Sequence, residues 1–200
     1  MADKPQFNAA IPATPRLVGQ RRGIRAVGTD EVIARAGVAK ATLYRHFATK
    51  NDLVLAVLQR REQLWTQGLI EEQSRQRGTT PEEQLLAIFD VMHDWFHLRD
   101  GCEGCSFINV LLELGADHPV GQACVAHIDH VRDIVRARAV SAGLTDVEDL
   151  AWSWRILMKG AIIMAAVGDK DAALRARRMA CVLIDEHRPM SAADAGEAVG

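Results

Sequence analysis

The residues best suited to chemistry lie in the run 40–50, Lys-Ala-Thr-Leu-Tyr-Arg-His-Phe-Ala-Thr-Lys. At about 100° per residue, Leu43 and Phe47 share one face of a helix that begins near Lys40. The opposite face and its flanks carry Thr42, Tyr44, Arg45 and His46. A short helix with such hydroxyl, cationic and aromatic groups fits a DNA major groove about 12 Å wide and reaches base edges and phosphates. The pattern therefore predicts a helix that reads DNA.

A second short helix must position this one. Thr29 is its predicted N-cap, and Asp30 and Glu31 follow in the first turn, where the helix dipole favours negative charge. Gly37 is expected to end the helix in the left-handed conformation. Two helices joined by so short a turn form a helix-turn-helix, the geometry that places the second helix in the major groove.

The run 37–47, Gly-Val-Ala-Lys-Ala-Thr-Leu-Tyr-Arg-His-Phe, followed by Thr49 and Lys50, resembles the TetR (tetracycline-repressor) family of bacterial regulators. The resemblance covers roughly residues 20–65 strongly. It continues more loosely through Gly-Cys-Ser-Phe-Ile-Asn at 104–109 and His-Pro-Val at 118–120. It implies a homodimeric repressor that binds double-stranded operator DNA and is released by a small-molecule effector.

The resemblance also assigns DNA contacts to individual residues. It implies phosphate contacts for Thr29, Lys40, Tyr44, His46 and Lys50, and base-edge contacts for Thr42 and Arg45. Lys50 is expected in the first turn of the next helix, where free backbone N–H groups also attract a phosphate. Tyr44 and His46 have a structural alternative, in which they pack the helix against its neighbours. Many relatives have Ser where this chain has Ala39, so one hydroxyl contact is missing.

Charge is distributed unevenly along the chain, although the net charge is only −2. Residues 1–60 carry ten Lys and Arg against four Asp and Glu, whereas residues 61–200 carry fourteen against twenty-two. A basic N-terminal quarter on an acidic body favours DNA contact at one end of the molecule.

The first twenty residues lack the apolar core of a secretory signal, and the most apolar run, 156–167, is too short to span a membrane. Together with the resemblance, this predicts a cytoplasmic location.

The N-terminus departs from the family pattern. Pro12 and Pro15 forbid an early helix, so at most residues 15–22 can be helical where relatives have a longer first helix. We expect a shortened first helix and a weakened module; a misassigned reading frame or start upstream of about residue 20 is an alternative explanation. The alternative function that follows is a dimeric helical ligand-binding protein with weakened or lost DNA binding.

Helix signals recur through the rest of the chain, and strand signals are absent. Capping patterns at Thr49 and Thr80 open helices over about 49–68 and 80–100, with a loop at 71–79 between them. Further helices are expected over 107–114, 117–142, 145–167, with Thr145 and Glu148 as caps, and 171–187. The predicted fold is all-α with about nine helices: an irregular arm at 1–14, a helix-turn-helix domain at 15–60, a larger effector-binding and dimerisation domain at 61–187, and a disordered tail at 188–200.

The last two predicted helices are rich in apolar side chains. Either these residues form core within one chain, or they form a four-helix bundle with a second copy; we favour the bundle, because a two-fold symmetric operator needs a two-fold symmetric reader. The residues are Trp152, Ile156, Leu157, Ile163, Met164, Met179, Val182 and Leu183.

An apolar or aromatic effector is expected among the helices of the larger domain. Its candidate lining residues are Phe89, Met92, Phe96, Phe107, Leu111, Trp152 and Met158.

No resident cofactor or metal is expected. Cys102 and Cys105 have zinc-type spacing, and His93 and His97 are one helical turn apart, which allows a metal or thiol-redox sensor. The gap between the two pairs is tight, so we expect ordinary, partly buried cysteines. The sequence has no nucleophile–base arrangement, phosphate-binding glycine loop or paired catalytic carboxylates, which argues against an enzyme. The sequence thus predicts a ligand-responsive homodimeric transcriptional repressor.

Overall fold

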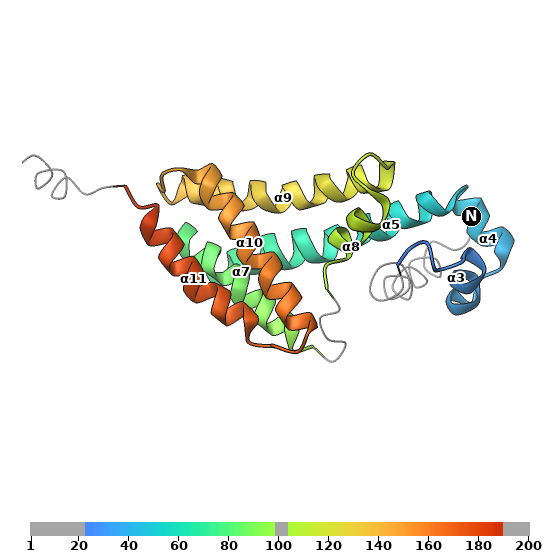
Figure 1. Cartoon of the computed structure of the whole chain (residues 1–200), viewed down its shortest axis with the longest axis horizontal. Helices are drawn as coiled ribbons and strands as arrows, with labels where there is room; N and C mark the ends of the chain where they lie inside the picture. The colour runs from blue at the N-terminus through green and yellow to red at the C-terminus, as the bar shows by residue number, and fades with distance from the viewer. Residues whose placement is uncertain (1–22, 99–103, 190–200) are drawn as a thin grey trace, which may run out of the picture. The chain divides into compact units, whose positions relative to one another are not determined.

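The computed structural model describes residues 23–98 and 104–189, and every regular element in these ranges is a helix (Figure 1). The elements are α3 (Thr29–Ala36), α4 (Lys40–His46), α5 (Lys50–Glu62), η1 (Gln63–Gln73), α6 (Ser74–Arg77), α7 (Pro81–Phe96), α8 (Ser106–Leu114), α9 (Pro119–Ser141), α10 (Val147–Ala166) and α11 (Ala172–Glu186). Because α5, η1 and α6 follow one another directly, the described ranges hold eight separate helices, against about nine expected. The all-α prediction is confirmed.

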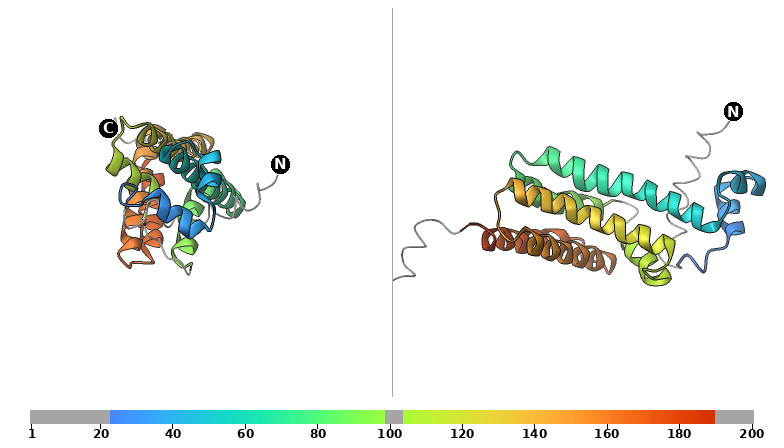
Figure 2. Two further views of the ribbon diagram at one scale, coloured as in Figure 1. Left: turned by 90° about the vertical axis from the view of Figure 1, so that its right-hand side faces the viewer. Right: turned by 90° about the horizontal axis from the view of Figure 1, so that it is seen from above.

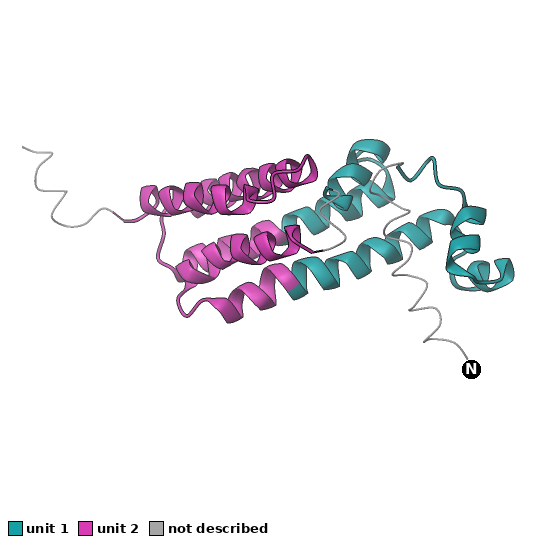
Figure 3. Ribbon diagram, turned by 90° about the horizontal axis from the view of Figure 1, so that it is seen from below, with its two compact units in different colours: residues 1–68, 103–130 teal, residues 69–102, 131–200 magenta. Residues whose placement is uncertain are grey.

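The chain divides into two compact units (Figure 3). Unit 1 consists of residues 1–68 and 103–130, and unit 2 of residues 69–102 and 131–200. The division into functional domains near residue 60 stays a prediction. The shortened first helix and the arm before it lie outside the described residues.

Unit 1 contains the two short helices and is held by apolar side chains from segments far apart in the sequence. Its buried residues include Ile24, Val32, Leu43, Leu53, Val57, Leu58, Trp65, Phe107, Val110 and Cys124. Burying such side chains contributes about 1.5–3 kcal/mol each. The buried side chains of α3 and α4, Val32 and Leu43, are therefore part of the core of unit 1.

In unit 2, α11 packs against both α7 and α10 (Figure 2). Phe89 of α7 and Trp154 of α10 are fully buried, and their ring centroids lie 5.2 Å apart. The tilted arrangement of the rings is one that aromatic pairs prefer. This contact joins α7 and α10 in the core of unit 2.

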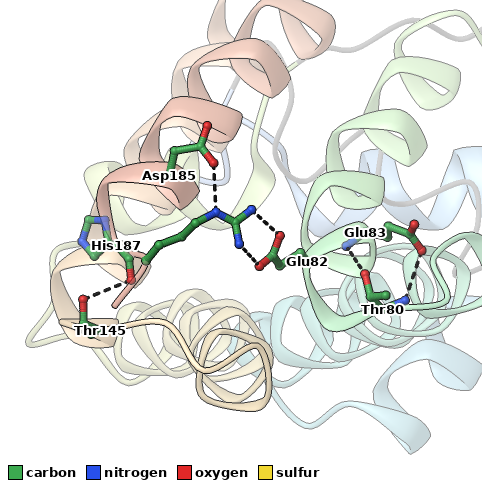
Figure 4. A network of polar contacts seen from close by, with 7 residues as sticks. Thr80, Glu82, Glu83, Thr145, Asp185 and His187 are labelled. Atoms are coloured by element: carbon green, nitrogen blue, oxygen red, sulfur yellow. Dashed lines mark hydrogen bonds and ion pairs between the residues drawn. The ribbon is translucent and has the colours of Figure 1, made fainter. Parts of the chain in front are cut away.

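Local capping signals were reliable at two helix starts. Thr49 and Asp52 form the expected reciprocal capping box at the start of α5. Thr80 and Glu83 form another at α7, with Pro81 at the first helical position (Figure 4). Each box satisfies backbone N–H groups that have no partner within the helix.

Two other predicted caps are wrong. The N-cap of α3 is Gly28, so Thr29 occupies the first helical position instead. The N-cap of α10 is Asp146, which has a left-handed φ of 45°. Thr145 donates from both its backbone N–H and its hydroxyl group to the carbonyl oxygen of His187, at 2.8 and 3.0 Å (Figure 4). A long-range bond thus replaces the local cap.

The predicted loop at 71–79 is also wrong over most of its length. The helix that begins at Lys50 does not end near Gly68 but continues through the π-helical η1 and through α6 to Arg77. A π-helix longer than a single turn is rare, so we expect contacts from other elements to stabilise this one. That support comes from α9.

Arg138 of α9 is buried and bonds to the C-terminal part of this helix within unit 2. Its guanidinium group donates to the carbonyl oxygens of Glu71 at 2.8 Å and Ile70 at 3.5 Å, and to the hydroxyl oxygen of Ser74 at 2.7 Å. It also donates to the carbonyl oxygen of Gln84 in α7, at 3.0 Å. A planar group with five donors can satisfy several acceptors at once. Arg138 therefore explains why polar residues 71–77 stay helical.

The C-terminal end of the described chain is also bonded. Arg188, which the sequence analysis assigned to the tail, donates to both carboxylate oxygens of Glu82 at 2.6 and 2.8 Å. It also donates to Asp185 at 3.1 Å (Figure 4). A bidentate ion pair between Arg188 and Glu82 therefore fixes residue 188 within unit 2.

Candidate nucleic-acid interface

The turn between α3 and α4 has the geometry of a helix-turn-helix. Gly37 has a φ of 64°, and its N–H donates to the carbonyl oxygen of Ile33, which ends α3. Leu43 of α4 and Val32 of α3 are both buried. The apolar side of α4 therefore docks inward, as its sequence pattern predicts, and its polar side remains exposed.

All seven predicted DNA-contact residues lie in unit 1 and have accessible side chains. Four are exposed and belong to α4: Lys40, Tyr44, Arg45 and His46. Three are half-buried: Thr29, Thr42 and Lys50. Tyr44 keeps 43% of its surface exposed, and whether it contacts DNA or packs α4 against its neighbours stays a prediction. The arrangement brings hydroxyl, phenol, guanidinium and imidazole groups onto one short helix.

Several of these groups contact one another or the preceding helix. The ammonium group of Lys40 lies 3.0 Å from a carboxylate oxygen of Asp30, and this hydrogen bond raises the pKa of Lys40. The hydroxyl oxygens of Thr29 and Tyr44 lie 3.4 Å apart, close enough to face a single phosphate together. These contacts connect α3 to α4 and hold the polar face of α4 in place.

Lys50 bonds within the module. Its Nζ donates to the carbonyl oxygen of Ile24 at 2.6 Å, which joins the start of α5 to the segment before α3. An ammonium group has three donors, so this bond leaves donors that can serve a phosphate.

Glu113 is a functional candidate that the sequence analysis missed. From α8, its carboxylate accepts hydrogen bonds from the backbone N–H groups of Ile24 at 2.7 Å and Arg25 at 2.6 Å. A Cβ on Gly23, whose φ is +76°, would lie 2.7 Å from a Glu113 carboxylate oxygen. Ile24 is thus held on its N–H side by Glu113 and on its carbonyl side by Lys50. No sequence signal marks this contact, because its partners are 88 and 89 residues apart.

Comparison with known proteins agrees with this geometry. Residues 17–57 match the sequence profile of bacterial regulatory proteins of the tetR family. Residues 81–179 match the profile of the C-terminal domain of LmrA/YxaF-like transcriptional regulators. The chain belongs to the TetR family. Members of this family are DNA-binding transcriptional regulators and not enzymes, which is the class that the sequence analysis expected.

Individual TetR-family relatives support this assignment. The HTH-type transcriptional activator FasR of Mycolicibacterium smegmatis is 32% identical over 144 residues, which cover 66% of this chain and 65% of FasR. The match thus spans slightly less than two thirds of that relative's length. A TetR-family transcriptional regulator from Streptomyces coelicolor superposes with a TM-score of 0.83 at 25% identity, over 92% of this chain and 96% of that chain. The reduced form of Escherichia coli NemR gives a TM-score of 0.75 at 19% identity, over 90% and 97% of the two chains, and supports the fold alone.

The predicted effector-lining residues of this TetR-family chain are divided between the two units. In unit 2, Phe89, Met92, Phe96 and Met158 are fully buried, whereas Trp152 is 51% exposed, with the guanidinium carbons of Arg155 and Arg132 at 4.5 and 5.5 Å from its ring. In unit 1, Phe107 is buried and Leu111 is half-buried. The structure therefore places Trp152 on the surface of unit 2, and the effector pocket stays a prediction.

Each unit contains a hollow whose lining residues differ from the predicted effector-lining residues. The hollow in unit 1 is lined by Ile24, Val27, Thr29, Val32, Lys50, Leu53 and Val54. The hollow in unit 2 is lined by Ser153, Ile156, Leu157, Met179, Val182, Leu183 and Glu186. Within residues 23–98 and 104–189, no helix is both long enough and apolar enough to cross a bilayer.

A second polar cluster in unit 1 joins α5 to α9. Glu62 pairs with Nδ1 of His127 and, at 2.8 Å, with Nδ1 of His130. Burial lowers the pKa of His127, and the nearby Glu62 carboxylate only partly offsets this shift. Sequence spacing does not mark this cluster, because Glu62 is 65 positions from His127 and 68 positions from His130.

Replacing Glu113 with Ala is expected to loosen the segment before α3. Two backbone N–H groups lose a charged acceptor, which is expected to lower the free energy of unfolding by about 1–3 kcal/mol. Amide hydrogen exchange should show faster exchange at Ile24 and Arg25, and urea titration should give the stability change. Glu72→Ala, at an exposed position, is the control and should leave both quantities near wild type. Unchanged protection of Ile24 in Glu113→Ala would contradict the proposed role of this contact.

Proposed function

We propose that this chain is a ligand-responsive transcriptional repressor that binds operator DNA as a homodimer. The observation that carries the proposal is the exposed polar face of α4. On the opposite face of this helix, the buried Leu43 packs into the core of unit 1. A helix docked in this way presents base-reading and phosphate-binding groups without losing its own packing.

Roles are proposed for the individual groups. Thr42 and Arg45 read base edges, because a guanidinium group can donate two hydrogen bonds to O6 and N7 of guanine. The five other groups bind phosphates and set the position of the helix on the duplex. They are Thr29, Lys40, Tyr44, His46 and Lys50. Lys40 exchanges its exposed ion pair with Asp30 for a phosphate, at little cost because such pairs are weak in water.

The proposed dimer forms through α10 and α11 of unit 2. The large apolar side chains that the sequence analysis assigned to the interface are exposed or half-exposed in the isolated chain. The most exposed are Ile156 at 71%, Met179 at 61% and Val182 at 57%. Monomeric proteins seldom expose so many large apolar groups on adjacent elements, so a covered surface is expected. A two-fold pairing would present two copies of α4 to a symmetric operator.

The proposed response to an effector passes through α8. Glu113 connects α8 to the backbone of Ile24, which also bonds to Lys50 at the start of α5. An effector that favours one position of α8 would move this segment and alter the placement of α4. The ligand changes operator affinity only by the difference between its affinities for the two states.

Replacing Arg45 with Ala tests the proposed base reading. One guanine contact is worth about 1–3 kcal/mol, so each half-site is expected to lose roughly 5- to 150-fold in discrimination. The measurement is selection of bound sequences from random duplexes, followed by anisotropy titration at several salt concentrations. Arg45→Ala should relax base preference at particular positions.

The matched control is Arg35→Ala, which removes an exposed arginine from α3 that is paired with Glu31 at 3.0 Å. It should keep the wild-type base preference. Equal base preference in wild type and Arg45→Ala would refute the role of Arg45. Failure of the wild-type chain to bind any duplex at low salt would refute DNA binding itself and favour a dimeric ligand-binding protein.

Repression is tested separately from binding. Transcription in vitro from the promoter beside the selected site is expected to fall when the protein is added and to recover with its effector. The relative FasR is named an activator. If the amount of transcript increases when the protein is added, the repressor assignment is wrong, whereas the proposed DNA binding is unaffected.

A further inference from the structure

Three metal-binding side chains meet in unit 2, at the end of α7 and just before α11. His93, His97 and Asp171 each offer one ligand atom, and these atoms all lie within 4.8 Å of one another. We propose that the three residues form a binding site for one divalent transition-metal ion of the zinc class. This site differs from the cysteine-containing site considered from the sequence, because its third ligand comes from 74 positions further along the chain than His97.

The helix register brings the two imidazoles together. His93 and His97 are four residues apart, so they lie on the same face of α7 at its C-terminal end. Their ring centroids are 4.4 Å apart and the rings are tilted by 58°. Histidines with this spacing on a helix are a recurrent way to hold zinc from one side.

A hydrogen bond prepares His97 for coordination. Its Nδ1 lies 2.9 Å from the backbone carbonyl oxygen of His93. A carbonyl oxygen only accepts, so Nδ1 must carry the proton, which leaves the lone pair on Nε2 for a metal. Metal-ligating histidines usually have such a backbone partner on the second nitrogen.

His93 supplies a second, independent sign of a missing partner. Its Nδ1 is buried and has no hydrogen-bond partner among the described residues. Such an atom destabilises the folded state unless water or an ion satisfies it.

Asp171 provides the anionic ligand from the N-cap position of α11. Its backbone N–H donates to Asp169 at 3.1 Å, which holds the turn before α11. Arg175 is a nearby competing cation: its guanidinium group donates to Asp169, at 2.9 Å, and the negative charge of Asp171 also helps to raise the pKa of Arg175. Two neutral imidazoles and one carboxylate favour Zn²⁺, Co²⁺ or Ni²⁺ over Mg²⁺ and Ca²⁺, which prefer oxygen ligands. Water would complete the coordination shell.

The bound ion would connect α7 to the start of α11 within unit 2. An ion that binds the folded state alone raises its stability by mass action. Full-length, metal-free protein titrated with Co²⁺ is therefore expected to bind one ion per chain, with visible d–d absorption. Zn²⁺ should displace the Co²⁺ and raise the thermal midpoint by about 5–10 °C at 100-fold excess over its dissociation constant.

Two ligand variants and two controls test the assignment. His97→Gln and Asp171→Asn change exposed side chains, and each is expected to weaken Co²⁺ binding at least about tenfold, since even outer-shell partners are worth that much. His118→Gln in unit 1 and Asp133→Asn on α9 should bind Co²⁺ like wild type. Circular dichroism checks that all four variants fold.

Three results would overturn the proposal. The first is no Co²⁺ or Zn²⁺ binding by the wild-type protein, and the second is wild-type affinity in both ligand variants. The third is a thiolate-to-cobalt absorption band that Cys105→Ser abolishes, because it would assign the ion to a cysteine. None of these results depends on DNA binding, so the test stands apart from the proposed regulatory function.

Discussion

Ile156→Glu in α10 is expected to convert the proposed dimer to a monomer and to weaken operator binding by about 100-fold or more. Ile156 is 71% exposed in the single chain and lines the same hollow as Met179 and Val182 of α11. In the proposed dimer, this position becomes buried against the partner copy. Burying an unpaired carboxylate costs far more than the modest gain from each apolar contact.

The loss of DNA affinity follows from the loss of the dimer. A monomer presents one α4 and keeps the contacts of a single half-site. Each good base contact is worth about 1–3 kcal/mol, and every 1.4 kcal/mol is a factor of about ten, so losing a second set of contacts costs at least two orders of magnitude.

Light scattering after size exclusion and anisotropy titration with the selected operator measure both effects. Val140→Glu is the matched control, because Val140 is 56% exposed and belongs to α9, outside the lining of that hollow. It should remain dimeric and bind DNA normally. If Ile156→Glu also stays dimeric, the α10–α11 interface is incorrect; if it becomes monomeric yet binds the operator with full affinity, the need for two copies of α4 is refuted.

Arg138→Met is expected to lower the free energy of unfolding by about 3 kcal/mol or more. The substitution keeps much of the side-chain volume but removes the donors to Ser74 and to three backbone carbonyl oxygens. A hydrogen bond to a charged group contributes about 1.5–3 kcal/mol, and the substitution removes several of them at once, although the carbonyl oxygen of Ile70 keeps the hydroxyl donor of Ser74. Burial lowers the pKa of the Arg138 guanidinium, a sign of the desolvation cost that these hydrogen bonds offset.

Urea denaturation gives the change in unfolding free energy, and amide exchange locates it. Protection should fall most in residues 70–77, where the helix depends on Arg138. Arg138→Lys should be intermediate, because an ammonium group keeps the charge but lacks the planar set of donors.

Arg136→Met on the exposed side of α9 is the control and should change stability by no more than about 0.5 kcal/mol. A stability loss in Arg138→Met no larger than in this control would show that residues 70–77 hold their helix without it.

Helix α4 shows how much local sequence could predict. The spacing of Leu43 and Phe47 sets which side of α4 docks, and Gly37 supplies the left-handed residue that ends α3. The capping boxes at Thr49 and Thr80 are equally local, because each joins residues three positions apart. Such features depend on the 3.6-residue helical period and on short side chains, and both can be read directly from the chain.

The features that only the tertiary structure decided join residues far apart in the sequence. Thr145 lies where a local cap was expected, yet it bonds to the carbonyl oxygen of His187, 42 residues away. Residues 71–77 look like a loop until Arg138 is placed beside them, and Glu113 has no visible role until its carboxylate meets the backbone of Ile24. Sequence by itself thus determined the family, the all-helical fold and the outward face of α4, because these depend on local periodicity and on a specific motif. The tertiary structure decided how far the helix from Lys50 extends, which long-range bonds hold the turns and which side chains meet at the proposed metal site. These outcomes depend on contacts between residues that are far apart in the sequence.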